Sequence, residues 1–300
     1  MRVLEYCLQV WLVTTDHLTD RIWFRDEDDF KVGMNLVAVL ACVYPVEILA
    51  FTLMSNHVHF VLACSYEQAK QFANEFKRRY AQHVRKKYGA KEYLRGNDLD
   101  ICPLDGMDES QEWGIAYVQM NCVAANICLS PINYPWGTGN SFFKTTPTRG
   151  RRLDSFSGRA RMRLLHSEEE LPPHLIVGED GYILPESYVQ VDRVESIFRT
   201  PKRMNYFLQN SSKAKRRRES GKTEAPSFRD QIVQSAIPDL CQTLFRKRSF
   251  EDLAGEEQTE LLRQLRFRFS SNPNQLARVT GLSYETVVSM LDGMWLSGDK

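Results

Sequence analysis

Apolar positions in the first half of the chain follow a two-residue period in some stretches and a helical period in others. Residues 4–14 mix aromatic and β-branched side chains, which predicts a strand. Two further apolar runs, 47–54 and 58–64, are separated by the short polar pair Ser55-Asn56. Because a short polar break between two apolar runs is typical of a hairpin, these runs predict two antiparallel strands.

Helical spacing appears in three other stretches. Residues 30–42 follow four acidic residues at 26–29, and acidic side chains favour the first turn of a helix. In residues 66–88, Phe72, Phe76, Tyr80 and Val84 recur every four residues, and Gly89 is placed to end this helix. Residues 108–122 predict a third helix, and a short strand is expected within 93–102.

The predicted order of elements is strand, helix, two strands, helix, short strand and helix. This order indicates an α+β fold with a ferredoxin-like antiparallel sheet and helices on one face. It occupies residues 1–145. Residues 146–210 form an accessory region whose role the sequence does not reveal, and residues 211–227 form a basic linker with almost no apolar content. Residues 228–300 predict a helical domain.

The helical domain contains a stretch with the spacing of a helix-turn-helix. Ala277 allows two helices to approach closely, Gly281 makes the turn, and Val287 packs the second helix. Ser283 is placed to cap that helix. Helix pairs of this shape bind DNA in some proteins and only pack or bind partners in others.

Composition narrows the class of protein. The seven cysteines are scattered and form no C-x-x-C pair, which excludes a zinc ribbon and argues against a disulfide framework. No apolar run approaches the length of a membrane-spanning helix. We therefore expect a cytoplasmic protein without a membrane partner.

Positive charge is clustered although the net charge is only +1. Residues 199–248 contain thirteen Lys or Arg against four Asp or Glu, and a second cluster lies in residues 77–87. Such clusters are typical of a local phosphate-binding surface, and also of a solvated helix face.

His57 and His59 are the first candidates for chemistry. Residues i and i+2 of a strand face the same side, so the two imidazoles are expected side by side, where they could bind one metal ion. Taken alone, the H-x-H pattern also occurs in purely structural pairs.

Tyr117 and Asn121 are the second candidates. On a helix, residues i and i+4 project from one face, so the two side chains would point into one site. Asn121 offers a carbonyl oxygen as a third metal ligand, and the Tyr117 phenol can attack a phosphorus atom. A core tyrosine beside an exposed asparagine would give the same pattern.

These motifs together resemble a known family. Residues 53–62 (LMSNHVHFVL) resemble the histidine motif of the HUH single-tyrosine transposases, and the closest group looks like the REP-associated tyrosine transposases with an IS200-like domain. Residues 116–121 (AYVQMN) are similar to the tyrosine helix of that group. Residues 134–136 (YPW), 24–30 (FRDEDDF) and 77–80 (KRRY) agree as well. The resemblance spans residues 4–143, with departures at Ser55, Cys122 and Asn126.

The resemblance implies the chemistry of the site. His57, His59 and Asn121 match the metal ligands of the family, and Tyr117 matches its nucleophile. The family implies a divalent Mg²⁺ or Mn²⁺ ion, cleavage that leaves the 5′ phosphate on tyrosine, and a free 3′ hydroxyl that later rejoins strands. The expected partner is single-stranded or hairpin DNA. The resemblance leaves open whether the protein also forms a homodimer.

The residues expected to contact DNA carry positive charge, an aromatic ring or a place in the helix-turn-helix-like stretch. They are Lys77, Arg78, Arg79, Tyr80, Arg85, Lys86, Lys87, Arg95, Gln275, Arg278, Ser283 and Tyr284. Tyr80 and Tyr88 are rival nucleophiles, but core packing fits Tyr80 better because no ligand-type residue lies one turn away on its apolar stripe.

Two other functions compete with a transposase. A non-catalytic or domesticated DNA-binding regulator would keep the same fold and the same C-terminal helix pair. A replication-initiation nickase would often carry a second tyrosine near Tyr117, and residues 113–129 contain none.

Overall fold

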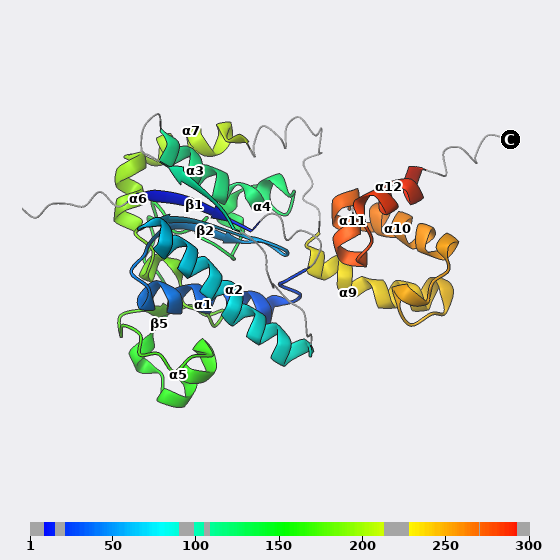
Figure 1. The fold of residues 1–300 in the computed structure, drawn as a ribbon, viewed down its shortest axis with the longest axis horizontal. Coiled ribbons are helices and arrows are strands. Elements are labelled where there is room, and N and C mark those ends of the chain that lie inside the picture. Colours follow the sequence, from blue (N-terminus) through cyan, green and yellow to red (C-terminus); the bar gives the residue numbers. More distant parts are fainter. Residues whose placement is uncertain are drawn as a thin grey trace, which may run out of the picture.

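Four strands form one antiparallel sheet in a computed structural model of the protein (Figure 1), which describes residues 9–15, 22–89, 99–104, 109–212, 228–269 and 271–292. The sheet has the strand order β2-β3-β1-β4. Its strands are β1 (Val10–Thr14), β2 (Glu47–Leu53), β3 (Val58–Ala63) and β4 (Asp100–Leu104). Helices α1 (Glu27–Val43) and α2 (Tyr66–Tyr88) make the two crossovers. The β-α-β-β-α-β order with this strand arrangement confirms the predicted ferredoxin-like sheet.

The β2–β3 hairpin turns where the polar break predicts it. Leu53 pairs with Val58, and the backbone N–H of Met54 donates to the carbonyl of His57 at 2.8 Å. The carbonyl of Ser55 accepts hydrogen bonds from the backbone N–H groups of Trp23 and Phe24. These bonds fix the tip of the hairpin against the segment that leads into α1.

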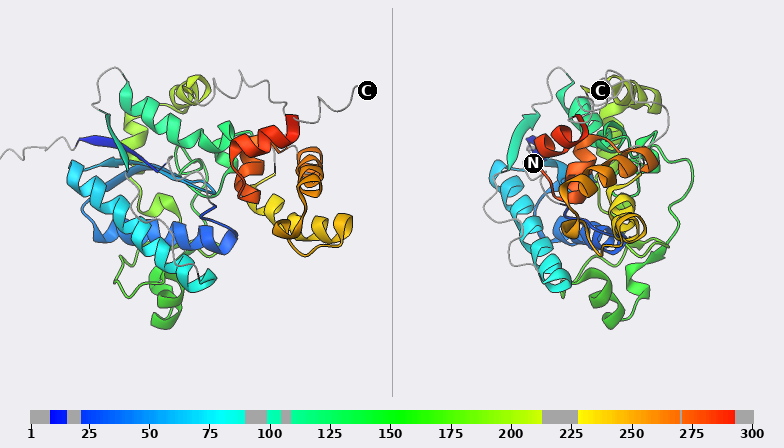
Figure 2. Two further views of the ribbon diagram at one scale, coloured as in Figure 1. Left: turned by 45° about the vertical axis from the view of Figure 1, so that its right-hand side comes forward. Right: turned by 90° about the vertical axis from the view of Figure 1, so that its right-hand side faces the viewer.

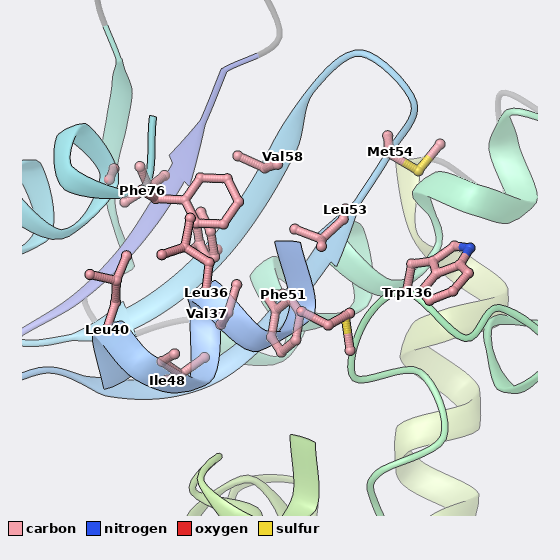
Figure 3. Close-up of a cluster of buried hydrophobic side chains, with 14 of the residues drawn as sticks. Leu36, Val37, Leu40, Ile48, Phe51, Leu53, Met54, Val58, Phe76 and Trp136 are labelled. Carbon is pink, nitrogen blue, oxygen red and sulfur yellow. The ribbon is translucent and has the colours of Figure 1, made fainter. Parts of the chain in front are cut away.

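Helices α1 and α2 cover one face of the sheet. Alternate β3 residues Val58, Phe60 and Leu62 point into this layer, together with the apolar stripe of α2. Figure 3 shows the central part of this core between α1 and the strands. The boundaries of α2 agree with the predicted helix, because Ser65 caps its start and Gly89 ends it in the left-handed region at φ 68°.

A second helical layer covers the opposite face, which the sequence pattern did not predict. It consists of α3 (Ser110–Gln119), α6 (Val191–Phe198) and α7 (Pro201–Asn210). Phe198 and Phe207 pack with the apolar residues of α3 against Val61 and Ala63 of β3. Figure 1 shows α3 and α7 above the sheet, with α1 and α2 below it. The predicted accessory region therefore helps to bury the α3 face.

The remainder of the accessory region packs on α1. It contains β5 (Arg151–Arg152), β6 (Ile176–Val177) and α5 (Gly158–Leu165). The buried side chain of Asn35 joins both parts, because its Nδ2 donates to the carbonyl of Leu164 at 3.0 Å and its Oδ1 accepts from the N–H of Ile183 at 2.8 Å. This amide fixes the C-terminal end of α5 against α1.

The C-terminal residues form a helical bundle with its own core at one end of the sheet domain (Figures 1 and 2). Its α-helices are α9 (Asp230–Leu240), α10 (Gly255–Phe269), α11 (Pro273–Thr280) and α12 (Tyr284–Asp292). Ile22 of the N-terminal part belongs to this core, which joins the bundle to the segment before α1. Across the described residues, none of the helices is both long enough and apolar enough to cross a bilayer.

Asp29 is the most completely buried carboxylate of the α1–α2 layer. Its oxygens contact His83 Nε2 at 2.8 Å, Lys87 Nζ at 2.9 Å and the hydroxyl of Tyr88 at 2.8 Å. Burial alone would raise the pKa of this carboxyl, but the hydrogen bonds from His83, Lys87, the Arg25 N–H and Tyr88 lower it from 3.8 to about 2. Asp29 is therefore charged in the folded protein and bonds α1 to α2.

We expect Asp29→Asn to destabilise the fold by about 3 kcal/mol, because it leaves a buried cluster of donors without its anion. Since the folded pKa is lowered, the stabilisation is full above pH 3.8 and is lost as the pH falls toward 2. Urea unfolding at neutral pH measures the loss. Acid titration of the folding free energy should show a smaller decline in this window for the variant. Asp28→Asn, at an exposed position of the same turn, is the control; an equal loss in both would contradict the role of Asp29.

Candidate functional site

The two histidines lie where the hairpin begins its second strand. His59 pairs with Thr52 of β2 on one side and with Thr14 of β1 on the other. Because β3 side chains alternate, His59 points to the α3 face, away from the Val58 and Phe60 side chains that fill the α1–α2 core. The centre of the sheet thus carries an imidazole where its neighbours on the same face, Val61 and Ala63, are apolar.

The imidazoles of His57 and His59 lie side by side, with ring centroids 4.8 Å apart and planes at 85°. His59 is fully buried, whereas His57 is partly exposed. The Nδ1 of His57 lies 2.8 Å from the side-chain oxygen of Asn56. Since an amide oxygen only accepts, Nδ1 is the donor, and Nε2 is the ring nitrogen that would bind a metal ion.

Tyr117 stands over this pair. Its ring centroid lies 5.6 Å from that of His59, edge to face at 89°. The position is fixed by the backbone of α3, because the Thr52 hydroxyl donates to the carbonyl of Val118 at 3.0 Å. Thr52 is also the cross-strand partner of His59. Thr52 therefore links the strand that carries His59 to the helix that carries Tyr117.

Asn121 lies one turn beyond Tyr117, but the helix is not continuous as predicted. α3 ends at Gln119, and the short helix α4 (Asn121–Ala124) follows a turn at Met120. The amide nitrogen of Asn121 donates to the carbonyls of Tyr117 at 2.9 Å and Val118 at 3.3 Å. With its nitrogen used to cap α3, the side chain has its oxygen as the remaining ligand atom.

The donor set suits a divalent ion bound by two imidazoles and one amide. Among the residues that the structure describes, no group of three or more His, Cys, Asp or Glu side chains could hold a metal ion. His57, His59 and the amide oxygen of Asn121 are the residues that could hold such an ion, with oxygens from water or substrate completing its coordination.

One further polar residue lies in the same row of the sheet. Asp100 of β4 pairs with Thr14, which itself pairs with His59. Asp100 is exposed, and its backbone lies two strands from that of His59 in the same row, about 10 Å away at ordinary strand spacing. The irregular apolar pattern of residues 93–102 gave no signal for its register.

The predicted DNA contacts of α2 are only partly compatible with the structure. Tyr80 is a core residue: it is 0% exposed, stacks on Phe76 with centroids 6.0 Å apart, and donates its hydroxyl to the carbonyl of Trp23 at 2.9 Å. The prediction that Tyr80 contacts DNA is therefore wrong, because the helical stripe that carries Tyr80 faces the sheet. Lys77 is buried too, which contradicts a direct contact with DNA in this conformation.

The remaining basic residues of α2 reach the surface. Arg78 and Arg79 both bond Glu75, Lys87 bonds Asp26 and Asp29, and Arg85 and Lys86 are exposed. All of them belong to the layer on the face opposite His59 and Tyr117. Arg95 lies outside the described residues.

The C-terminal helix pair has the predicted turn. Gly281 adopts φ 75° between α11 and α12, Val287 is fully buried, and the Ser283 hydroxyl accepts from the N–H of Thr286 at 3.1 Å. The two helices are thus joined by a short turn, while a DNA-binding helix-turn-helix and DNA contact by Ser283 and the exposed Tyr284 stay predictions.

Two other residues of this pair are structural. Gln275 is buried and donates to the carbonyl of Phe228 at 2.6 Å and to Asp230 at 3.0 Å. Arg278 forms a two-pronged ion pair with the buried Asp230, at 2.9 and 3.0 Å. The prediction that Gln275 reads DNA is wrong, because its amide joins α11 to α9. The charge of Arg278 is neutralised in the same cluster.

Comparison with known proteins gives a family match for one segment of the chain. Residues 20–99 match the family model described as "Transposase IS200 like". This segment holds α1, the histidine hairpin and α2, and its match agrees with the resemblance that the motifs indicated. Tyr117 lies beyond the matched residues. No curated protein matches the chain.

One solved structure is similar to part of the chain. It is described as "Structure of the REP associates tyrosine transposase bound to a REP hairpin". The similarity has a TM-score of 0.34 and 12% sequence identity, and it covers 47% of this chain and 82% of that one.

Proposed function

We propose that the protein is a metal-dependent transposase that cleaves and rejoins single-stranded DNA through a phosphotyrosine on Tyr117. The observation that carries the proposal is the aromatic cluster on the α3 face, in which Tyr117 lies 5.6 Å from His59 and His59 lies 4.8 Å from His57. Two histidines at the start of β3 and a tyrosine of α3, far apart in the sequence, thus lie together, and the histidines fall within the residues that match the family.

The nucleophile step is an in-line displacement at phosphorus. The Tyr117 oxygen forms a bond to phosphorus, the bond from phosphorus to the 3′ oxygen breaks, and the phenolic proton passes to solvent while the released 3′ oxygen takes up a proton. The 5′ phosphate stays on the tyrosine. Attack by a 3′ hydroxyl reverses the step, so strands are rejoined without a nucleotide cofactor.

His57, His59 and Asn121 would hold the ion, Mg²⁺ or Mn²⁺. The bound ion would polarise the scissile phosphate and stabilise charge in the transition state. The protein orients its own groups: Asn56 fixes the tautomer of His57, and Thr52 holds α3 at the strand of His59. The partly exposed His57 and the half-buried Tyr117 leave the site open to a strand from outside.

The direct test is a covalent adduct. Purified protein is incubated with 5′- and 3′-labelled single-stranded and hairpin DNA in Mg²⁺ or Mn²⁺, and in EDTA. We expect a denaturation-resistant adduct that carries the label downstream of the cut, and only in the presence of the ion. DNA binding without any adduct would instead support the alternative of a non-catalytic regulator that has kept the fold.

A further inference from the structure

A groove of about 960 Å³ lies between α2 and the C-terminal end of α5. It belongs to the α1–α2 side of the sheet, whereas His57, His59 and Tyr117 belong to the α3 side. Figure 1 shows α5 projecting below α1 and α2, away from α3. The groove is therefore separate from the proposed cleavage site.

The walls of the groove are held by specific contacts between distant parts of the chain. Asn35 fixes the end of α5 through the carbonyl of Leu164. Arg79 reaches Glu169, beyond α5, at 3.5 Å. His83 and His166 face each other across the groove, with ring centroids 6.0 Å apart, and His83 is held by the buried Asp29. The cavity is thus a defined feature of the fold.

Positive charge dominates the lining. Five Lys or Arg side chains and one carboxylate, Glu168, line the groove; the five are Arg78, Arg79, Lys86, Lys87 and Arg163. Carboxylates already hold three of them, because Arg78 and Arg79 bond Glu75 and Lys87 bonds Asp26 and Asp29. Within the described part of the chain, Lys86 and Arg163 enter no ion pair. These two exposed cations come from opposite walls and are available to an anion.

Apolar side chains also line the groove, beside the uncharged polar residues Gln82 and Ser167 and the two histidines. The apolar ones are Val32, Leu36, Met162 and Leu165. Leu36 and Leu165 are nearly buried, whereas Met162 is 50% exposed. A cationic rim above an apolar floor matches a ligand with a phosphate at one end and a flat ring at the other.

We propose that this groove binds a nucleotide unit. Lys86 and Arg163 contact its phosphate, and the base lies against Met162 and Leu36. The unit is either a free mononucleotide or one nucleotide of a DNA strand, since both present the same chemistry. The site gives a role to the accessory region, because α5 supplies Met162, Arg163 and Leu165.

The test uses full-length Tyr117→Phe protein in EDTA, so that binding is measured without cleavage. The probes are a short fluorescein-labelled single-stranded oligodeoxynucleotide, followed by anisotropy, and 5′-dAMP and inorganic phosphate, followed by calorimetry. The variant combines Lys86→Glu with Arg163→Glu. We expect it to weaken binding of the oligonucleotide, of 5′-dAMP or of both by at least about tenfold, and to reduce the salt dependence of binding.

The matched control combines Lys70→Glu with Arg159→Glu. These residues are exposed on the same two helices, they do not line the groove, and the charge change is equal. The control should change affinity by less than about twofold. A loss confined to the oligonucleotide identifies a strand, and a loss for 5′-dAMP identifies a free nucleotide. Equal weakening in variant and control, no binding of either probe by the parent, or phosphate binding as tightly as 5′-dAMP would overturn the proposal.

Discussion

Tyr117→Phe should abolish the covalent protein–DNA adduct, with a fall of at least about a thousandfold in the rate of strand cleavage. The substitution removes one oxygen and leaves the ring. Because the contact of Tyr117 with His59 is a ring contact, at 5.6 Å and 89°, phenylalanine can keep it and hold α3 in place. The variant should therefore fold, bind DNA and bind Mn²⁺ like the parent. Gel analysis of denatured reactions measures the adduct, and mass spectrometry of the digested adduct locates the modified residue.

Tyr88→Phe is the matched control, since Tyr88 is a rival nucleophile near many basic residues. Its hydroxyl donates to Asp29 at 2.8 Å, and burial together with that hydrogen bond raises the pKa of the phenol. Such a phenol is a poor nucleophile, so the adduct should persist in Tyr88→Phe. An adduct of unchanged yield in Tyr117→Phe would refute the nucleophile assignment, wherever the modified residue was then found.

Local signals in the sequence were strong enough to predict the elements that carry this site. The two apolar runs around Ser55-Asn56 became β2 and β3, and the stripe of Phe72, Phe76 and Tyr80 became α2 with a left-handed glycine at its end. Strand and helix periods depend on neighbours a few residues apart, so one sequence is sufficient to read them.

Packing between distant segments could not be predicted from these local periods. The α3 face is closed by Phe198 and Phe207, which lie about eighty residues downstream of α3, and no periodic pattern links them to it. The same limit explains the errors at Tyr80 and Gln275. Tyr80 follows three basic residues in the sequence but points to the carbonyl of Trp23. Gln275 bonds the buried Asp230, which also holds Arg278.

The candidate site contains one feature that follows from local periodicity and one that depends on packing between distant segments. That His57 and His59 share one face follows from the period of a strand. That Tyr117 meets them depends on Thr52, which joins the strand of His59 to the carbonyl of Val118 across 66 positions of the sequence. No spacing rule gives this contact. From the sequence alone, only the likeness to a family in which the two motifs occur together brought them into one site.

His57→Ala should remove most of the metal-dependent activity, with a loss of at least about a hundredfold in adduct formation and in Mn²⁺ affinity. His57 is the better residue to test because it is partly exposed, whereas His59 is fully buried among Tyr117, Thr14 and Thr52, so that His59→Ala would also leave a cavity. Titration of Mn²⁺ by electron paramagnetic resonance measures binding directly, independently of cleavage.

His174→Ala, an exposed histidine outside the site, is the control for a general effect of losing an imidazole. The two readouts of His57→Ala separate two roles. Loss of both Mn²⁺ binding and adduct means that the imidazole acts as a ligand. Loss of the adduct with Mn²⁺ binding intact would contradict the ligand assignment and would place His57 at the DNA phosphate instead. The bond of His57 to Asn56 favours the ligand role, because a proton held on Nδ1 makes Nε2 the ring nitrogen that would bind the ion.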